Sequence, residues 1–174
     1  MPRPNLLHLV VALLVLCSSA EIAAQAAGPV STTVTVGGSV SQSLALTVAD
    51  LKRFPAHPID YMPAQTDLKS GAGPARRYTG CLLRDILAAA KPVEGKPHDL
   101  RKSYVVAGAS DGYEVVFSWA ELFVSSVGDN VYLVYERDGA PLPDDEGRIA
   151  LVVLTDLRPI RHVKWLSTLT LRAA

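Results

Sequence analysis

Three basic side chains lie close together near the C-terminal end of the sequence, at Arg161, His162 and Lys164. Guanidinium groups offer phosphate a fork of N–H donors, and ammonium groups offer it a compact charge. These residues are therefore a candidate anion-binding cluster, with an ordinary solvated face as the alternative. Arg76 and Arg77 follow a Gly-Pro pair and could also meet an anion, although loop charges exposed to solvent are the commoner explanation.

The sequence contains two cysteines, Cys17 and Cys81. Cys81 directly precedes a helix expected to begin near Leu82. A helix N-terminus and the nearby Arg84 would both lower the pKa of its thiol, which predicts a reactive thiol or an unusual metal ligand. The alternative is a small buried side chain, which the usual burial of free cysteine favours.

Other residue types that often do chemistry show no diagnostic spacing. His57, His98 and His162 are scattered, so a helical zinc site is not supported. The acidic stretch 144–146 lacks the ligand spacing of a calcium loop and is expected to be a solvated turn. No serine stands in a Gly-x-Ser-x-Gly elbow, which leaves hydrolase chemistry without support. The sequence alone therefore designates no catalytic residue and no metal ligand.

The strands that must position these residues are expected where β-branched or alternating runs are bounded by glycine, proline and polar residues. They span residues 32–36, 39–46, 104–107, 113–117, 131–136, 149–154 and 168–171. The run at 149–154 is apolar throughout, which predicts a central, buried strand. Asp111-Gly112 is expected to close a hairpin. Residues 57–66 are expected to be extended and residues 70–74 to form a loop.

One full helix is predicted over residues 82–90, where apolar side chains recur at helical spacing. Thr47, with Asp50 three residues later, is expected to cap a short helix, and Ser118 another. Residues 162–166 are expected to form a short turn or helix. Strands interrupted by one main helix and short helices predict an α+β fold, a mixed sheet or barrel with helices to one side.

Residues 1–26 have the features of a secretory signal peptide: Arg3, an apolar run over 6–16 and a small-x-small site at 24–26. Residues 27–174 are then expected to form a single domain that is periplasmic or secreted. The 17 basic and 17 acidic residues balance, so nucleic acid is not an expected partner. No later apolar run is long enough to span a bilayer, so no membrane association is expected after signal cleavage, and no protein partner is indicated.

Several different short motifs follow one another along the chain. They are Val36-Gly37-Gly38-Ser39-Val40, Leu46-Thr47-Val48-Ala49-Asp50-Leu51, Tyr78-Thr79-Gly80 with Asp85-Ile86-Leu87, Ser110-Asp111-Gly112-Tyr113, Asp138-Gly139 with Pro141-Leu142, and Arg161 with Val163-Lys164. None is specific alone, but together they resemble the oxidoreductase molybdopterin-binding domain of the sulfite oxidase type. The chain is similar to a short, single-domain, exported member of that family.

The resemblance implies a sulfite oxidase-type molybdopterin-binding fold and molybdopterin as the cofactor. It implies that Arg161 and Lys164 hold the phosphate of the pterin, and that Asp111 and Tyr113 shape the pocket from their hairpin. Arg148 is a candidate for a displaced positive charge, because Ala150 stands where the family has an arginine.

The chain also differs from the family that it resembles, at the position of the residue that binds the metal. Family enzymes hold molybdenum through a protein thiolate on the segment that corresponds to residues 57–77, and that segment contains no cysteine. The sequence therefore predicts an oxidoreductase-family member without the molybdenum-ligating cysteine, which binds a pterin-like or small anionic ligand. The alternative is a non-catalytic periplasmic binding or interaction module that keeps the fold without the cofactor. Whether the chain is an enzyme stays open at this point.

Overall fold

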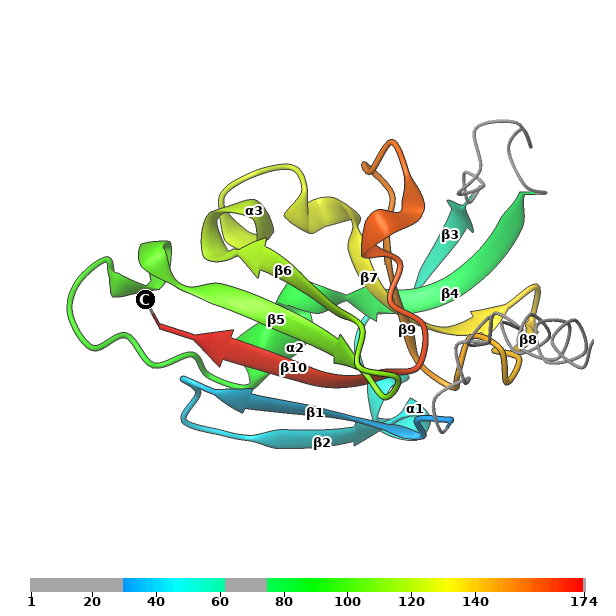
Figure 1. Cartoon of the computed structure of the whole chain (residues 1–174), viewed down its shortest axis with the longest axis horizontal. Coiled ribbons are helices and arrows are strands. Elements are labelled where there is room, and N and C mark those ends of the chain that lie inside the picture. The colour runs from blue at the N-terminus through cyan, green and yellow to red at the C-terminus, as the bar shows by residue number, and fades with distance from the viewer. Residues whose placement is uncertain (1–29, 62–74, 174) are drawn as a thin grey trace, which may run out of the picture.

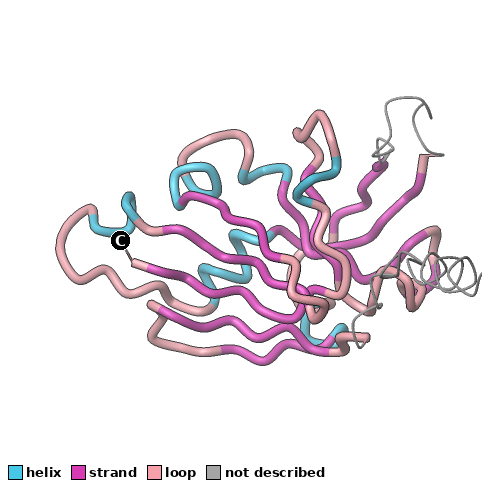
Figure 2. The backbone as a smooth tube through the Cα atoms, in the orientation of Figure 1, coloured by secondary structure: helices cyan, strands magenta, loops and turns pink. Residues whose placement is uncertain are grey.

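The computed structural model describes residues 30–61 and 75–173, and within them the strands form two sheets (Figures 1 and 2). The first sheet has the order β2-β1-β10-β5-β6. Its strands are β1 Thr33–Gly38, β2 Leu44–Thr47, β5 Tyr104–Ala109, β6 Glu114–Ser118 and β10 Leu166–Arg172. It is mixed, because β1 runs parallel to β10 whereas the other neighbouring pairs are antiparallel.

The second sheet has the order β3-β4-β7-β8, and β9 also pairs with β7. Its strands are β3 His57–Tyr61, β4 Arg76–Leu82, β7 Val131–Arg137, β8 Ala140–Pro141 and β9 Ala150–Val153. The α helices are α1 Val48–Leu51, α2 Leu83–Ala89 and α3 Trp119–Phe123, and the 3-10 helices are η2 Asp99–Lys102, η3 Gly128–Asn130 and η4 Pro159–Arg161. The predicted α+β class, with a mixed sheet, one main helix and short helices, is confirmed.

The predicted helix starts are also confirmed. Thr47 and Asp50 form a reciprocal capping box at α1, and Ser118 and Glu121 form one at α3. The longest helix, α2, has no side-chain cap. It is held instead by burial of its apolar residues, among them Leu83, in the core between the two sheets.

Three local predictions differ from the structure. Only residues 44–46 of the predicted strand 39–46 are in a strand, because the chain turns at Gly38, where φ is +88° and an added Cβ would lie 2.0 Å from the Leu171 carbonyl oxygen. Strand β9 is buried as predicted, yet it is not central: it pairs with β7 on one side and forms only an isolated bridge to Val163 on the other. The helical turn expected at 162–166 lies earlier, at η4, because Pro159 sits at its first turn.

The apolar residues form a large core and a smaller one. The large core fills the space between the sheets and includes α2. The smaller core lies on one face of the second sheet and consists of Ile59, Tyr61, Tyr78, Val134, Leu142, Ala150 and Val152. Two loops border this face, 142–149 and 154–165, and the second rises beside β9 in Figure 1. Arg76, Glu146 and His162 lie beside this smaller core.

Some predicted features fall outside the described residues. These are the signal peptide at 1–26, the loop at 70–74 and the end of the extended segment at 57–66. Within residues 30–61 and 75–173, no helix is both long and apolar enough to cross a membrane.

Candidate functional site

A carboxylate is buried at the edge of the smaller core. Glu146 is 2 % exposed, and its Oε1 pairs with Nη1 of Arg76 at 3.0 Å and with Nη1 of Arg137. The hydroxyl of Tyr78 donates to its Oε2 at 3.1 Å. We call these four residues the Glu146 cluster. A buried carboxylate is stable only when it is paired and hydrogen-bonded, and here it has both kinds of partner.

Strand register explains why these residues meet. Tyr61 on β3 lies opposite Arg76 on β4, and Tyr78 on β4 lies opposite Arg137 on β7. Residues directly opposite each other share a face of the sheet, as do alternate residues along one strand. Arg76, Tyr78 and Arg137 therefore point to the same side, the side on which Glu146 lies.

A tight turn places Glu146 over this face. Its backbone N–H donates to the Pro143 carbonyl, and its own carbonyl accepts from the N–H of Trp165 at 2.8 Å. Gly147 follows with a φ of +84°, and an added Cβ there would lie 2.8 Å from the Cα of Trp165. Glycine is thus required by both the backbone conformation and the close approach of Trp165. The predicted solvated acidic turn is correct for Asp144 and Asp145, which are exposed, and wrong for Glu146.

His162 lies beside the Glu146 cluster. The ring of Tyr61 contacts both Tyr78 and His162, with centroids 6.0 Å and 5.7 Å apart. Nε2 of His162 is buried and has no hydrogen-bond partner within residues 30–61 and 75–173. Burial lowers the pKa of His162 to about 4; the Glu146 carboxylate opposes this shift, whereas Lys164 and Arg76 add to it. The imidazole is therefore neutral near pH 7.

Arg161 is held by two carboxylates rather than being free for a ligand. It donates through Nε and Nη2 to Asp156, at 2.9 Å and 2.5 Å, and through Nη1 to Glu121 at 3.1 Å. Its guanidinium also lies 4.8 Å from the centre of the Phe117 ring. Because two negative charges face one positive charge, Arg161 clamps the 154–161 loop to α3 and has little charge left for a phosphate.

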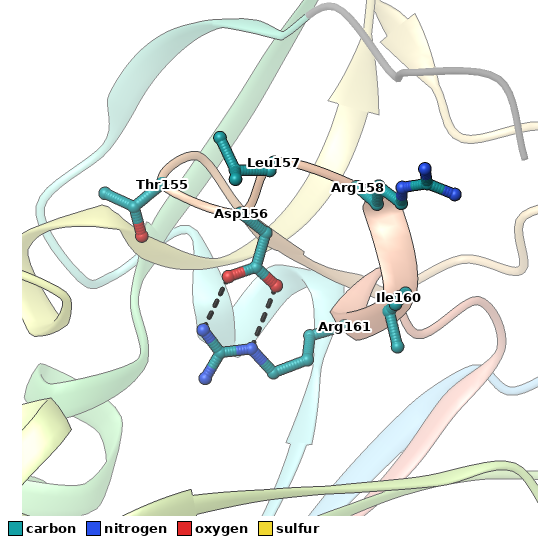
Figure 3. A pocket seen from close by; sticks show the side chains of 6 residues that line it. All are labelled: Thr155, Asp156, Leu157, Arg158, Ile160 and Arg161. Carbon is teal, nitrogen blue, oxygen red and sulfur yellow. Dashed lines mark hydrogen bonds and ion pairs between the residues drawn. The ribbon is translucent and has the colours of Figure 1, made fainter. Parts of the chain in front are cut away.

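The clamped loop forms one wall of an open hollow of about 590 Å³ (Figure 3). Its lining residues are Thr155, Asp156, Leu157, Arg158, Ile160 and Arg161. The bidentate pair of Asp156 and Arg161 faces this hollow, and Leu157 and Ile160 are largely exposed. The hollow thus combines an internally neutralised charge pair with apolar side chains.

The other predicted site residues lie on segments that touch one another. The turn at Asp111 is as predicted: its Oδ1 accepts from the N–H of Tyr113 at 2.9 Å. Tyr113 donates its hydroxyl to the Ile160 carbonyl, and the N–H of Ser110 donates to the Trp165 carbonyl. The 110–113 hairpin therefore contacts both ends of the 160–165 segment.

The two remaining predicted cations, Arg148 and Lys164, differ in whether they form an ion pair. Arg148 pairs with Asp144 through Nη2 at 2.6 Å and donates to the Leu142 carbonyl through Nη1. The ammonium of Lys164 lies 5.9 Å from the centre of the Trp165 ring and forms no ion pair in the described part of the chain. Lys164 is thus the predicted cation best placed to meet an anionic ligand.

Cys81 is a core residue. Its side chain is fully buried, and burial raises the pKa of its thiol to about 12, with a further contribution from Asp85. Arg84, which was expected to lower that pKa, pairs instead with Asp129. The prediction of a reactive thiol or metal ligand is therefore wrong, and the buried alternative is confirmed.

No group of His, Cys, Asp and Glu side chains within residues 30–61 and 75–173 has the arrangement of a metal site. Two of the three scattered histidines pack against different aromatic rings. His57 packs against Tyr132, with ring centroids 5.6 Å apart, and His162 packs against Tyr61.

The fold and the order of its motifs define a class of protein. The model of the oxidoreductase molybdopterin binding domain family matches residues 22–174, and the chain belongs to that family. Mitochondrial sulfite oxidase from Macaca fascicularis is 29% identical over 155 residues, and that from Mus musculus is 28% identical over 156 residues. Each match covers 79% of this chain but only 28% of the sulfite oxidase.

A solved structure has the same fold. The sulfane dehydrogenase SoxCD from Paracoccus pantotrophus superposes with a TM-score of 0.62 at 22% identity, over 80% of this chain and 38% of that chain. This confirms the predicted sulfite oxidase-type fold.

The residues of this chain fit one part of a molybdopterin group and not another. Cations suited to a phosphate are present beside the smaller core, namely Lys164, Arg76 and Arg137. Within the described residues, the thiol of Cys81 does not fit the role of a metal ligand, because it is enclosed in the large core with a raised pKa.

Proposed function

We propose that this chain binds a pterin-type ligand through the ligand's phosphate and does so without a thiolate bond from the protein to a metal. Membership of the molybdopterin-binding family supports the ligand class. The observation that carries the proposal is the contact of the 110–113 hairpin with the 160–165 segment, where Lys164 is left without an ion pair. An ammonium group without an ion pair is suited to bind an anionic group.

The proposal separates binding from redox chemistry. Residues 57–77 contain no cysteine, and the thiol of Cys81 is inaccessible in the core. A molybdenum atom would therefore need a protein ligand other than thiolate, or none. Because the chain covers only 28% of the sulfite oxidases that it matches, their catalytic activity is not carried over to it.

Localisation and partners belong to the same proposal. The apolar run over 6–16 and the small-x-small site at 24–26 support export of the chain to the periplasm or medium. The ligand is proposed to be a small anion, and the balanced charge gives no support for binding to nucleic acid.

Lys164→Ala is expected to lower the amount of pterin that co-purifies with the protein by about tenfold, because a charge-assisted contact to phosphate is lost. Oxidised-pterin fluorescence per mole of protein measures this. Lys96→Ala is the matched control: Lys96 is exposed and lies in the segment between α2 and β5, which lies beside the C-terminus in Figure 1. Equal pterin in the two variants would contradict the proposed role of Lys164.

Arg161 is unsuited to the same test. Changing Arg161 and Lys164 together would leave the fold intact only if both side chains were exposed. Arg161 instead joins Asp156, Glu121 and the Phe117 ring, so its removal would release the 154–161 loop whether or not a ligand is bound there.

A further inference from the structure

The Glu146 cluster and its neighbour Lys164 contain more positive than negative charge. Arg76 and Arg137 both pair with one carboxylate oxygen, Oε1 of Glu146. Lys164 lies close enough to lower the pKa of His162 in the same place, and it forms no ion pair in the described residues. Two cations thus share a single carboxylate, and a third lies near the neighbouring imidazole. Partly buried cations in excess favour the approach of an anion.

The side chains of Arg76 and Arg137 are partly exposed to solvent, whereas the carboxylate that pairs with them is buried. The side chains of Arg76 and Arg137 are 34% and 23% exposed, whereas that of Glu146 is 2% exposed. Their ion pairs to Glu146 use Nη1 of each arginine. A guanidinium carries five N–H donors in a planar fork, so each arginine keeps donors for a second acceptor.

A hollow of about 500 Å³ opens beside Arg76, lined by Asp60, Ala75, Arg76, Arg77 and Asp138. Its two carboxylates are both bonded to Arg77: Asp60 to Nε at 3.0 Å, and Asp138 to the backbone N–H at 3.0 Å. Arg77 therefore pairs with the acidic residues of this hollow, which borders Arg76 but is not lined by Arg137, Glu146 or His162.

His162 supplies an independent sign of a ligand. Its Nε2 is buried next to the cluster and has no hydrogen-bond partner among the described residues. Buried polar atoms in folded proteins are ordinarily hydrogen-bonded. An oxygen-rich group, or a water molecule that it carries, would satisfy this nitrogen.

We propose that Arg76 and Arg137, oriented by Glu146, form a recognition site for a tetrahedral oxyanion of the phosphate type, with His162 as a neighbouring hydrogen-bonding group. Glu146 acts here as a positioning residue: it fixes both arginines on one face of the sheet and limits their net charge. The assignment rests on the proposed function, which it deepens by naming the residues and the chemical group that they recognise.

Calorimetric titration of pterin-free protein with inorganic phosphate at low ionic strength tests the site. Arg76→Ala is expected to weaken phosphate binding about tenfold, because charge-assisted donors are lost. Glu146→Gln is expected to strengthen it about threefold to tenfold, because the competing charge is removed while the amide keeps hydrogen bonds to the arginines or to Tyr78. Arg101→Ala, which removes an exposed arginine on η2 in another part of the fold, is the control and should leave binding unchanged.

A purely structural role for the cluster would change stability in these variants and leave phosphate affinity alone. That outcome, or the absence of phosphate binding in the wild type, would overturn the proposal. Arg76 is one-third exposed, so its variant remains informative even if Glu146→Gln fails to fold.

Competition identifies the source of the oxyanion. Displacement of phosphate by a pterin phosphomonoester, but not by the unphosphorylated pterin, would assign the site to the phosphate of the ligand. Simultaneous binding of phosphate and pterin phosphomonoester would assign it to a separate oxyanion. Both results support the site. Because the titration needs no bound pterin, phosphate binding without any pterin in the purified protein would refute the proposed function alone.

Discussion

Glu146→Ala is expected to lower the free energy of unfolding by roughly 2–4 kcal/mol, among the largest effects of any polar substitution in this chain. The change leaves Arg76 and Arg137 without their shared carboxylate and removes the acceptor of the buried Tyr78 hydroxyl. Breaking a fully buried pair costs more, but both arginines reach solvent in part, which reduces the penalty.

Urea denaturation measures this effect, and the neighbouring acidic residues provide the control. Asp145→Ala removes an exposed carboxylate of the same turn and is expected to change stability by less than about 0.5 kcal/mol. Glu146→Gln should fall between the two, because the amide keeps hydrogen-bonding capacity without the charge. Equal effects of Glu146→Ala and Asp145→Ala would show that the cluster is not the buried ion pair described above.

The stability of the fold is expected to decrease on acidification in a way that depends on His162. Its pKa is about 4 in the folded protein and about 6.5 in an unfolded chain. The unfolded state therefore takes up the proton first as pH falls, and the stabilisation present above pH 6.5 is lost progressively towards pH 4. At about 1.4 kcal/mol per pKa unit, the loss amounts to roughly 2–3 kcal/mol by about pH 4.5.

Carboxylates titrate in part of the same range, so the test compares wild type with His162→Gln at each pH. The free energy of unfolding of the wild type should fall by about 2–3 kcal/mol more than that of the variant between about pH 7.5 and pH 4.5. Glutamine keeps a polar group near the position of Nε2 and cannot take up a proton. Parallel stability curves for the two proteins would mean that His162 titrates normally in the folded state.

Sequence patterns were sufficient where the decisive contacts are local. The capping boxes at Thr47 and Ser118 join residues three positions apart, and the apolar stripe of α2 repeats within two turns. The hairpin at Asp111 also follows from neighbouring residues, because its side chain accepts a bond from the N–H two positions later. The order of the motifs then supplied the family and its fold.

The candidate site could not be found in this way, because its contacts depend on strand register. Arg76 and Glu146 are 70 positions apart, and nothing in the acidic stretch 144–146 distinguishes its buried member from its exposed ones. Arg161 was expected to bind a phosphate. Its partner Glu121 lies 40 positions away on α3, so nothing in the sequence indicates that the guanidinium is already paired. Alternation of Arg76 and Tyr78 along β4 was a weak signal of a shared face, but only the pairing with β7 shows what that face meets.

We propose that this chain binds a phosphate-bearing pterin without a thiolate ligand to a metal. The most direct test is the pterin and metal content of protein purified from cells that make the cofactor, from oxidised-pterin fluorescence together with elemental analysis for molybdenum and tungsten. We expect close to one pterin per chain and far less metal. A well-folded sample without pterin, or one with a full complement of metal bound to the sulfur of Cys81, would contradict it.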